Sequence, residues 1–241
     1  MYISGIERLP RKKNRIYIDG EYAFMLYDSD LKQYHIEADG LDVEDGSENG
    51  IRISDELYTR ILKETVIRRA HQKALAILER MDRSEAELRQ KLKTDMYSEE
   101  VADETIAWLK QLHYLDDSRY AQSYIRNRID NSSRQELLSR LRAKGVDKET
   151  ADEAYMICRD ELNAQKTGKG LDPDAQGGDC EQPDPEQQAA FRLLAKKLGT
   201  DRNITLKEQR SAIGYMLRKG FRRNEIVQAF EALGLKIDYE E

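Results

Sequence analysis

Two short runs rich in apolar and aromatic residues near the start of the chain predict β-strands rather than helix. They are residues 15–18 and 21–26, and they flank Asp19-Gly20, a pair that favours a type I′ turn. Residues 50–53 predict a further short strand before the first helix. A sheet of two or three strands is marginally stable alone, so we expect its apolar face to pack on that helix. The sequence thus predicts a small N-terminal β-hairpin region.

From residue 54 onward the apolar residues recur at intervals of three and four, which predicts an almost unbroken succession of amphipathic helices. Three helix starts carry a capping box, in which a Ser or Thr hydroxyl and a later carboxylate satisfy exposed backbone N–H groups. These boxes occupy residues 84–87, 133–136 and 205–208. Because the first two lie at the same place in similar segments, they indicate an internal repeat.

Helix ends recur as well. Gly145 follows Lys144, and Gly220 follows Lys219, where each apolar pattern stops. Glycine adopts the left-handed conformation that ends many helices, and the apolar residue after it can fold back on the last turn. The first repeat has Met96 at this place, so the sequence defines the end of its helix less sharply.

These starts and stops predict a mainly α fold, a tandem array of three three-helix units that follows the hairpin region. The hairpin region would take residues 1–62, the first unit 63–115 and the second unit 116–162. The third unit, with an acidic tail, would take residues 187–241. Residues 163–186 break the helical period and hold three of the four prolines, so we expect a flexible acidic linker there.

The net charge of −6 hides a strong polarity along the chain. Lys and Arg outnumber Asp and Glu in residues 119–148 and again in 188–230, whereas the segment 160–187 between them is acidic. Basic faces of this kind favour a polyanion or an acidic protein surface as the partner, although solvated helix faces give similar runs.

Side chains that could perform catalysis or bind a metal are sparse. The two cysteines and three histidines show neither metal-ligand spacing nor a disulfide framework. His113 and Asp117 fit a turn between helices better than an acid–base pair. We therefore expect no enzyme, no cofactor and no metal. No apolar run is long enough to span a membrane and no signal peptide is evident, so we expect a cytoplasmic protein without a membrane partner.

A resemblance to a known family becomes specific in residues 109–146. The step Tyr-Leu-Asp-Asp is followed by an aromatic-Ala pair, a tyrosine, an arginine and the Lys-Gly stop, and together they resemble the central repeat of the RecX family. The family usually has glycine where His113 stands. The positions that the resemblance marks as structural are Tyr114, Leu115, Asp116, Asp117, Tyr120, Ala121, Tyr124, Gly145 and Gly220.

The resemblance implies a non-enzymatic modulator of the RecA recombinase that lies along the helical groove of RecA filaments on single-stranded DNA. It would inhibit the recombinase, ATPase and coprotease activities of RecA, and so act in DNA repair and the SOS response. Its partner would be the RecA nucleoprotein filament, and we expect a monomer in solution. The alternative is a helical module that binds single-stranded or duplex DNA directly, such as a DNA-binding transcriptional regulator, although we identify no recognition helix.

Basic residues of the second and third units are the candidates for contact with RecA or DNA. They are too many to be buried, so each is either a solvated charge or a contact. The candidates are Arg126, Arg128, Arg134, Arg140, Arg142, Lys144, Arg218, Lys219, Arg222 and Arg223. The residues expected in the core of the second unit are Tyr114, Leu115, Ala121, Tyr124, Leu137 and Leu141.

Overall fold

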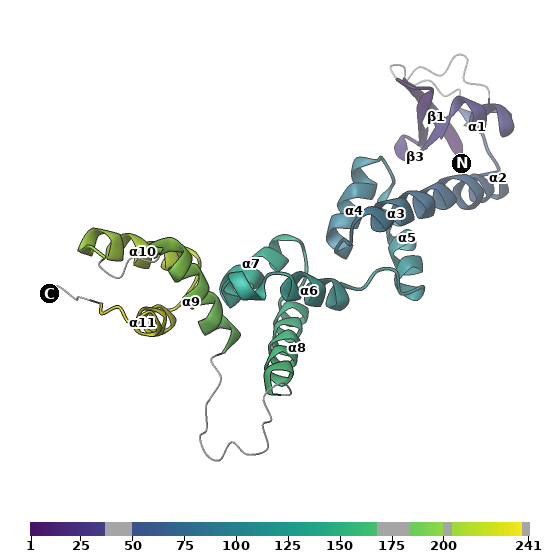
Figure 1. Ribbon diagram of the computed structural model, residues 1–241. Coiled ribbons are helices and arrows are strands. Elements are labelled where there is room, and N and C mark those ends of the chain that lie inside the picture. The colour runs from purple at the N-terminus through teal and green to yellow at the C-terminus, as the bar shows by residue number, and fades with distance from the viewer. Residues whose placement is uncertain (37–49, 168–183, 200–203, 238–241) are drawn as a thin grey trace. The chain divides into compact units, whose positions relative to one another are not determined.

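The computed structural model describes residues 1–36, 50–167, 184–199 and 204–237 (Figure 1). The chain divides into two compact bodies, an N-terminal body, Met1–Asp116, and a C-terminal body, Asp117–Glu241. The N-terminal body holds a sheet and the first three-helix unit, and the C-terminal body holds the second and third units. We call these units the first, second and third repeats. None of the described helices is both long and apolar enough to cross a bilayer.

A four-stranded antiparallel sheet opens the N-terminal body, in the order β3-β2-β1-β4. Its strands are β1 (Tyr2–Leu9), β2 (Lys13–Ile18), β3 (Glu21–Tyr27) and β4 (Ile51–Arg52). The predicted hairpin is confirmed as β2 and β3, and both turn residues, Asp19 (φ 50°) and Gly20 (φ 88°), have the positive φ of a type I′ turn. The sequence did not predict β1. Its pairing with β2 shifts register between Ile3 and Gly5, and such an irregularity interrupts the regular pattern by which a strand is identified.

The short helix α1 (Asp28–Gln33) follows the sheet, and one long helical segment then packs on it. This segment consists of α2 (Asp55–Ile61), a π-helical turn η1 (Leu62–Ile67) and α3 (Arg68–Arg80). Ile61 and Val66 lie in the same core cluster as Ile16 and Phe24 of the sheet. The border that the sequence suggested between residues 62 and 63 falls inside this segment, because no cap, glycine or proline separates the two parts.

The first repeat combines α3 with α4 (Glu85–Thr94) and α5 (Glu99–Gln111) around a separate core. The hydroxyl of Ser84 accepts a hydrogen bond from the backbone N–H of Glu87 (3.2 Å), as the capping box predicts. Both helices end on a residue with positive φ that is not glycine, Met96 (φ 68°) after α4 and His113 (φ 57°) after α5. The first repeat thus has the left-handed helix ends that glycine provides elsewhere in the chain.

The second repeat consists of α6 (Asp117–Arg126), a 3-10 turn η2 (Ile129–Asn131), α7 (Arg134–Ala143) and α8 (Lys148–Thr167). The third repeat consists of α9 (Pro185–Leu198), α10 (Leu206–Arg218) and α11 (Arg223–Ala232). Gly145 (φ 83°) and Gly220 (φ 86°) confirm the predicted helix ends. The mainly α array of three-helix units behind a small sheet is therefore confirmed.

Helix α8 is longer than the sequence suggested. It continues to Thr167, into the stretch assigned to the linker, and α9 already begins at Pro185. The sequence of residues 163–167 contains neither glycine nor proline, the residues that disfavour helix most. The rest of the expected linker, residues 168–183, and the acidic tail from residue 238 lie outside the described residues.

Candidate functional site

Four of the ten candidate cations form salt bridges within the C-terminal body. Arg126 binds Glu161 of α8 (Nε–Oε2 3.0 Å), and Arg134 binds Asp152 (Nη2–Oδ1 2.7 Å). The Glu136 Oε1 atom accepts from both Arg140 (2.6 Å) and Lys219 (3.1 Å). Arg126 and Arg134 each have a carboxylate partner, and Arg140 and Lys219 share one, so these four cations together contribute less to the external field than the sequence suggested.

The other exposed cations have no such neutralisation. In the part of the chain that the structure describes, five of the candidates are exposed and form no salt bridge with a carboxylate. We call them the open cations: Arg128, Arg142, Arg218, Arg222 and Arg223. The sequence analysis missed Lys148, the first residue of α8, which is exposed and equally open.

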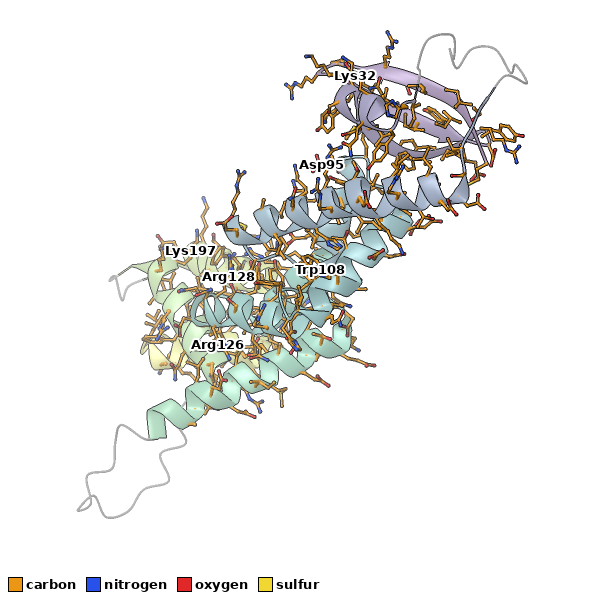
Figure 2. All side chains as sticks on the ribbon, turned by 90° about the vertical axis from the view of Figure 1, so that its right-hand side faces the viewer. Lys32, Asp95, Trp108, Arg126, Arg128 and Lys197 are labelled. Carbon is orange, nitrogen blue, oxygen red and sulfur yellow. The ribbon has the colours of Figure 1, made fainter. Side chains whose placement is uncertain are left out.

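Two tyrosines of α6 contact two of the candidate cations, the open cation Arg128 and Lys144. The Arg128 guanidinium lies 4.1 Å from the ring centroid of Tyr124, and the Lys144 ammonium lies 5.9 Å from the centroids of both Tyr120 and Tyr124. Contacts of this kind orient a cation without neutralising it, because the ring contributes only its quadrupole. Arg126 and Arg128, both labelled in Figure 2, therefore differ in kind although they are close in sequence.

The third repeat is joined to the second at the start of α7. The Ser133 hydroxyl accepts from the backbone N–H of Glu136 (3.1 Å) and donates to the backbone carbonyl of Lys219 (2.7 Å). The backbone N–H of Arg134 donates to the Glu186 carboxylate of α9 (2.9 Å). Burial raises the pKa of Glu186, and this effect outweighs the hydrogen bond from Arg134. Ser133 is therefore both a helix cap and a contact between repeats.

Gly220 allows this approach of the two repeats. Its φ of 86° belongs to the left-handed region, and a Cβ atom placed on it would lie 2.9 Å from the Ser133 Oγ atom and 3.1 Å from the Gln135 Cβ atom. Both distances are shorter than ordinary contacts of a Cβ atom. The glycine that the sequence identified as a helix end thus also provides space at the seam between the repeats.

Seven of the nine residues marked by the family resemblance lie around the junction of α5 and α6 or on α6, and the other two, Gly145 and Gly220, follow α7 and α10. Leu115 (3% exposed) and Ala121 (0%) are buried, Tyr120 and Tyr124 are half-buried, and α6 begins at Asp117 directly after Asp116. The expectation that Tyr114 lies in the core was wrong, because its side chain is 57% exposed. Leu115 is buried as expected, but in the core of the first repeat rather than the second, because it follows the left-handed turn at His113 that ends α5.

The histidine and the cysteine that lie within helices α3 and α8, His71 and Cys158, are explained by packing. His71 stacks on Trp108 with 3.9 Å between ring centroids, and burial lowers the pKa of its imidazole. Cys158 is buried on α8, and burial raises the pKa of its thiol. Among the described residues no three His, Cys, Asp or Glu side chains gather as a metal site would require.

Two family models match the chain in the regions just described. Residues 70–109 match the first three-helix domain of RecX, and residues 116–154 match its second three-helix domain. Both matches coincide with repeats that the structure defines by separate cores.

Several curated proteins described as regulatory protein RecX are similar to the chain. That of Finegoldia magna is 32% identical over 151 residues, which cover 61% of this chain and 68% of that protein. That of Clostridium acetobutylicum is 29% identical, over 63% of this chain and 66% of its own length. That of Clostridium beijerinckii is 25% identical over 91% of this chain and 89% of its own length.

Solved structures support the same fold. A crystal structure of regulatory protein RecX aligns with a TM-score of 0.54 at 22% identity, over 97% of this chain and 98% of that one. The crystal structure of RecX from Lactobacillus salivarius aligns with a TM-score of 0.54 at 20% identity, over 70% and 96%. Sequence relatives, family models and fold agree, and the chain belongs to the RecX family of regulatory proteins.

Proposed function

We propose that this protein regulates the RecA recombinase by binding RecA filaments on single-stranded DNA along their helical groove. Binding there inhibits the recombinase, ATPase and coprotease activities of RecA, and so modulates DNA repair and the SOS response. Membership of a family of regulatory proteins supports a regulatory role rather than a catalytic one. The protein acts as a monomer in the cytoplasm, where it meets RecA and DNA.

The open cations are the surface feature that supports this proposal most directly. They lie on the second and third repeats, and no described carboxylate neutralises them. Uncompensated charge on a folded surface accelerates association with a polyanionic assembly and makes the affinity depend on salt. Short helical repeats in tandem also suit a partner that is itself a helix, because successive repeats present similar faces along the chain.

Direct binding to nucleic acid is the second candidate function, and the two tyrosines of α6 favour it. Proteins that bind single strands combine aromatic rings with cations, and Tyr124 with Arg128 is such a pair. In this alternative the protein would bind naked DNA as tightly as it binds the filament.

One experiment separates the two candidates. We would titrate the protein into RecA that hydrolyses ATP on single-stranded DNA, and measure its binding to the same DNA without RecA at the same ionic strength. We expect inhibition at concentrations well below those that give detectable binding to naked DNA. Inhibition that only follows the occupancy of naked DNA would favour direct nucleic-acid binding, and no inhibition would contradict the regulation of RecA.

A further inference from the structure

A groove of about 410 Å³ lies at the seam between the second and third repeats, within the C-terminal body. We call it the seam groove. Three helices of the second and third repeats, α7, α8 and α9, supply most of its walls, and the segment before α11 completes it. Its lining residues are Arg134, Gln135, Leu138, Arg142, Lys148, Asp152, Glu186, Gly220 and Arg222.

Three of the four cations that line this groove lie at the starts of helices. Arg134 is the first residue of α7, Lys148 is the first residue of α8, and Arg222 is the N-cap of α11. The start of a helix is the positive end of its dipole, so it favours carboxylates and disfavours cations. Helices α4 and α5 follow that rule, with two glutamates each in the first turn. The helix dipole therefore does not explain the positions of Lys148 and Arg222, whereas Arg142, in the last turn of α7, lies where the dipole favours a cation.

Of the four cations in the seam groove, Arg134 has a carboxylate partner, and Arg142, Lys148 and Arg222 have none among the described residues. Arg134 is neutralised by Asp152 (2.7 Å). Arg142 donates from Nε to the Leu138 carbonyl (3.3 Å), which leaves its charge in place. Lys148 and Arg222 form no salt bridge within the described residues. A ligand in the groove would therefore meet three positive side chains on three different segments.

We propose that the seam groove binds an acidic peptide segment of a protein partner, with its carboxylates on Arg142, Lys148 and Arg222. The groove supplies positive charge from three sides, and guanidinium groups suit carboxylates because they can donate two parallel hydrogen bonds. Leu138 adds an apolar wall on which the aliphatic part of a Glu or Leu side chain can pack. The assignment of this segment to the RecA filament rests on the proposed function. The preference of the groove for an acidic peptide rests on its lining residues alone.

The lining favours a peptide over a nucleic-acid strand for two reasons. No ring is among the lining residues, whereas sites for single strands stack bases on aromatic side chains. Asp152 and Glu186 also lie in the wall, and a phosphodiester backbone, which carries a charge at every nucleotide, would pass close to them. An acidic peptide can instead place a polar or apolar residue at these points.

The groove exists only while the third repeat is joined to the second. Arg142 and Lys148 come from the second repeat, and Arg222 comes from the third. The Ser133–Lys219 hydrogen bond (2.7 Å) and the Glu136–Lys219 salt bridge (3.1 Å) hold the two together beside the groove. The two repeats therefore present one binding site that neither has alone.

Three variants of the full-length protein test this proposal. The groove variant carries R142Q, K148Q and R222Q. The control variant carries K196Q, K207Q and K236Q, which remove the same charge from exposed lysines outside the groove. The probes are a short fluorescein-labelled peptide rich in Asp and Glu with interspersed Leu, the same peptide with Asn and Gln, and an oligothymidine of equal charge, all followed by fluorescence anisotropy.

We expect wild-type protein and the control variant to bind the acidic peptide with equal affinity, and the groove variant to bind it about tenfold more weakly, because three exposed charge contacts are lost. The third variant, R142K/R222K, keeps the charge but not the two-pronged geometry, and should recover part of the affinity. Circular dichroism of all variants verifies that they fold as the wild type does.

Equal peptide binding by the groove and control variants would overturn the proposal. Preferential binding of oligothymidine that the groove variant loses would overturn it in favour of a nucleic-acid groove. Equal binding of the neutral peptide would show an apolar contact rather than an ionic one, and would also overturn it. None of these results bears on whether wild-type protein inhibits RecA, so failure of this inference and failure of the proposed function are distinguishable.

Discussion

Replacing Ser133 with alanine should destabilise the C-terminal body by more than the loss of a helix cap. The Ser133 side chain is fully buried, caps α7 through the Glu136 N–H group (3.1 Å), and donates to the Lys219 carbonyl of the third repeat (2.7 Å). Alanine removes both hydrogen bonds and leaves a donor in one repeat and an acceptor in the other without their partner.

The two losses can be estimated separately. Removal of a Ser cap destabilises a helix by about 1 kcal/mol. Loss of the second hydrogen bond, with an acceptor left unsatisfied at the seam, adds about 1–2 kcal/mol. We therefore expect S133A to lower the free energy of unfolding by about 2–3 kcal/mol.

Ser54 provides a matched control. It caps α2 through the Leu57 N–H group at 3.1 Å, is exposed, and among the described residues its hydroxyl bonds only within α2. S54A should therefore lose only the cap, about 1 kcal/mol. Urea denaturation followed by circular dichroism measures both variants, and hydrogen exchange locates the change. In S133A, exchange should increase in α10 as well as in α7.

The reasoning would be refuted if S133A and S54A were equally destabilised and exchange in α10 stayed at the wild-type rate. That result would mean that the Lys219 contact contributes nothing to the attachment of the third repeat.

Three further changes test other parts of the structure. Burial raises the pKa of Glu186 in the folded protein above its ordinary value of 4.5, so the native state holds the carboxyl proton more tightly than the unfolded chain does. The resulting stabilisation is present below pH 4.5 and is lost as the pH rises through the folded pKa. E186Q should flatten the pH dependence of the free energy of unfolding in urea over this range, and an unchanged slope would contradict the assignment. His113 is exposed with φ 57°, so H113G should stabilise the protein by about 0.5–1 kcal/mol in urea denaturation, and a loss would show that the imidazole makes a necessary contact. G220A should lower the free energy of unfolding by about 2 kcal/mol or more, because it adds backbone strain and a close approach to Ser133. G234A is the control, since Gly234 has φ 71° and open space around it, and should cost only about 1 kcal/mol. Equal losses in the two variants would argue against a tight seam.

The helix boundaries could be read from the sequence wherever a local signal sets them. The Ser133 box and the Gly145 and Gly220 stops depend only on neighbouring residues, so the pattern was sufficient. Met96 and His113 adopt the same left-handed conformation without glycine. There the following residue fixes the chain, since the Tyr97 N–H group donates back to Leu92 (3.1 Å) and the Tyr114 N–H group to Leu109 (2.9 Å). Such ends give no compositional signal.

The candidate site could be predicted only as a set of charges. The sequence identified basic segments, but Arg126 and Arg128 look equivalent in it although one meets Glu161 and the other meets Tyr124. Tyr124 is only four residues from Arg128, but the pairing of Arg126 with Glu161 depends on the packing of α6 against α8, which are far apart in the chain. For the same reason the attachment of the third repeat was missed, because Ser133 and Lys219 each already have a local role as a cap and a helix end.

The most direct test of the account compares open and neutralised cations in the inhibition of RecA. One variant carries R128Q, R218Q and R223Q, and its control carries R126Q, R140Q and R159Q, which remove the same charge from arginines that pair with carboxylates. ATP hydrolysis by RecA on single-stranded DNA is measured against the concentration of each protein at several salt concentrations. We predict that the open-cation variant inhibits more weakly and with a flatter salt dependence than the wild type, while the control inhibits almost as the wild type does. Equal inhibition by both variants across the salt range would contradict the claim that uncompensated charge on the second and third repeats binds the filament.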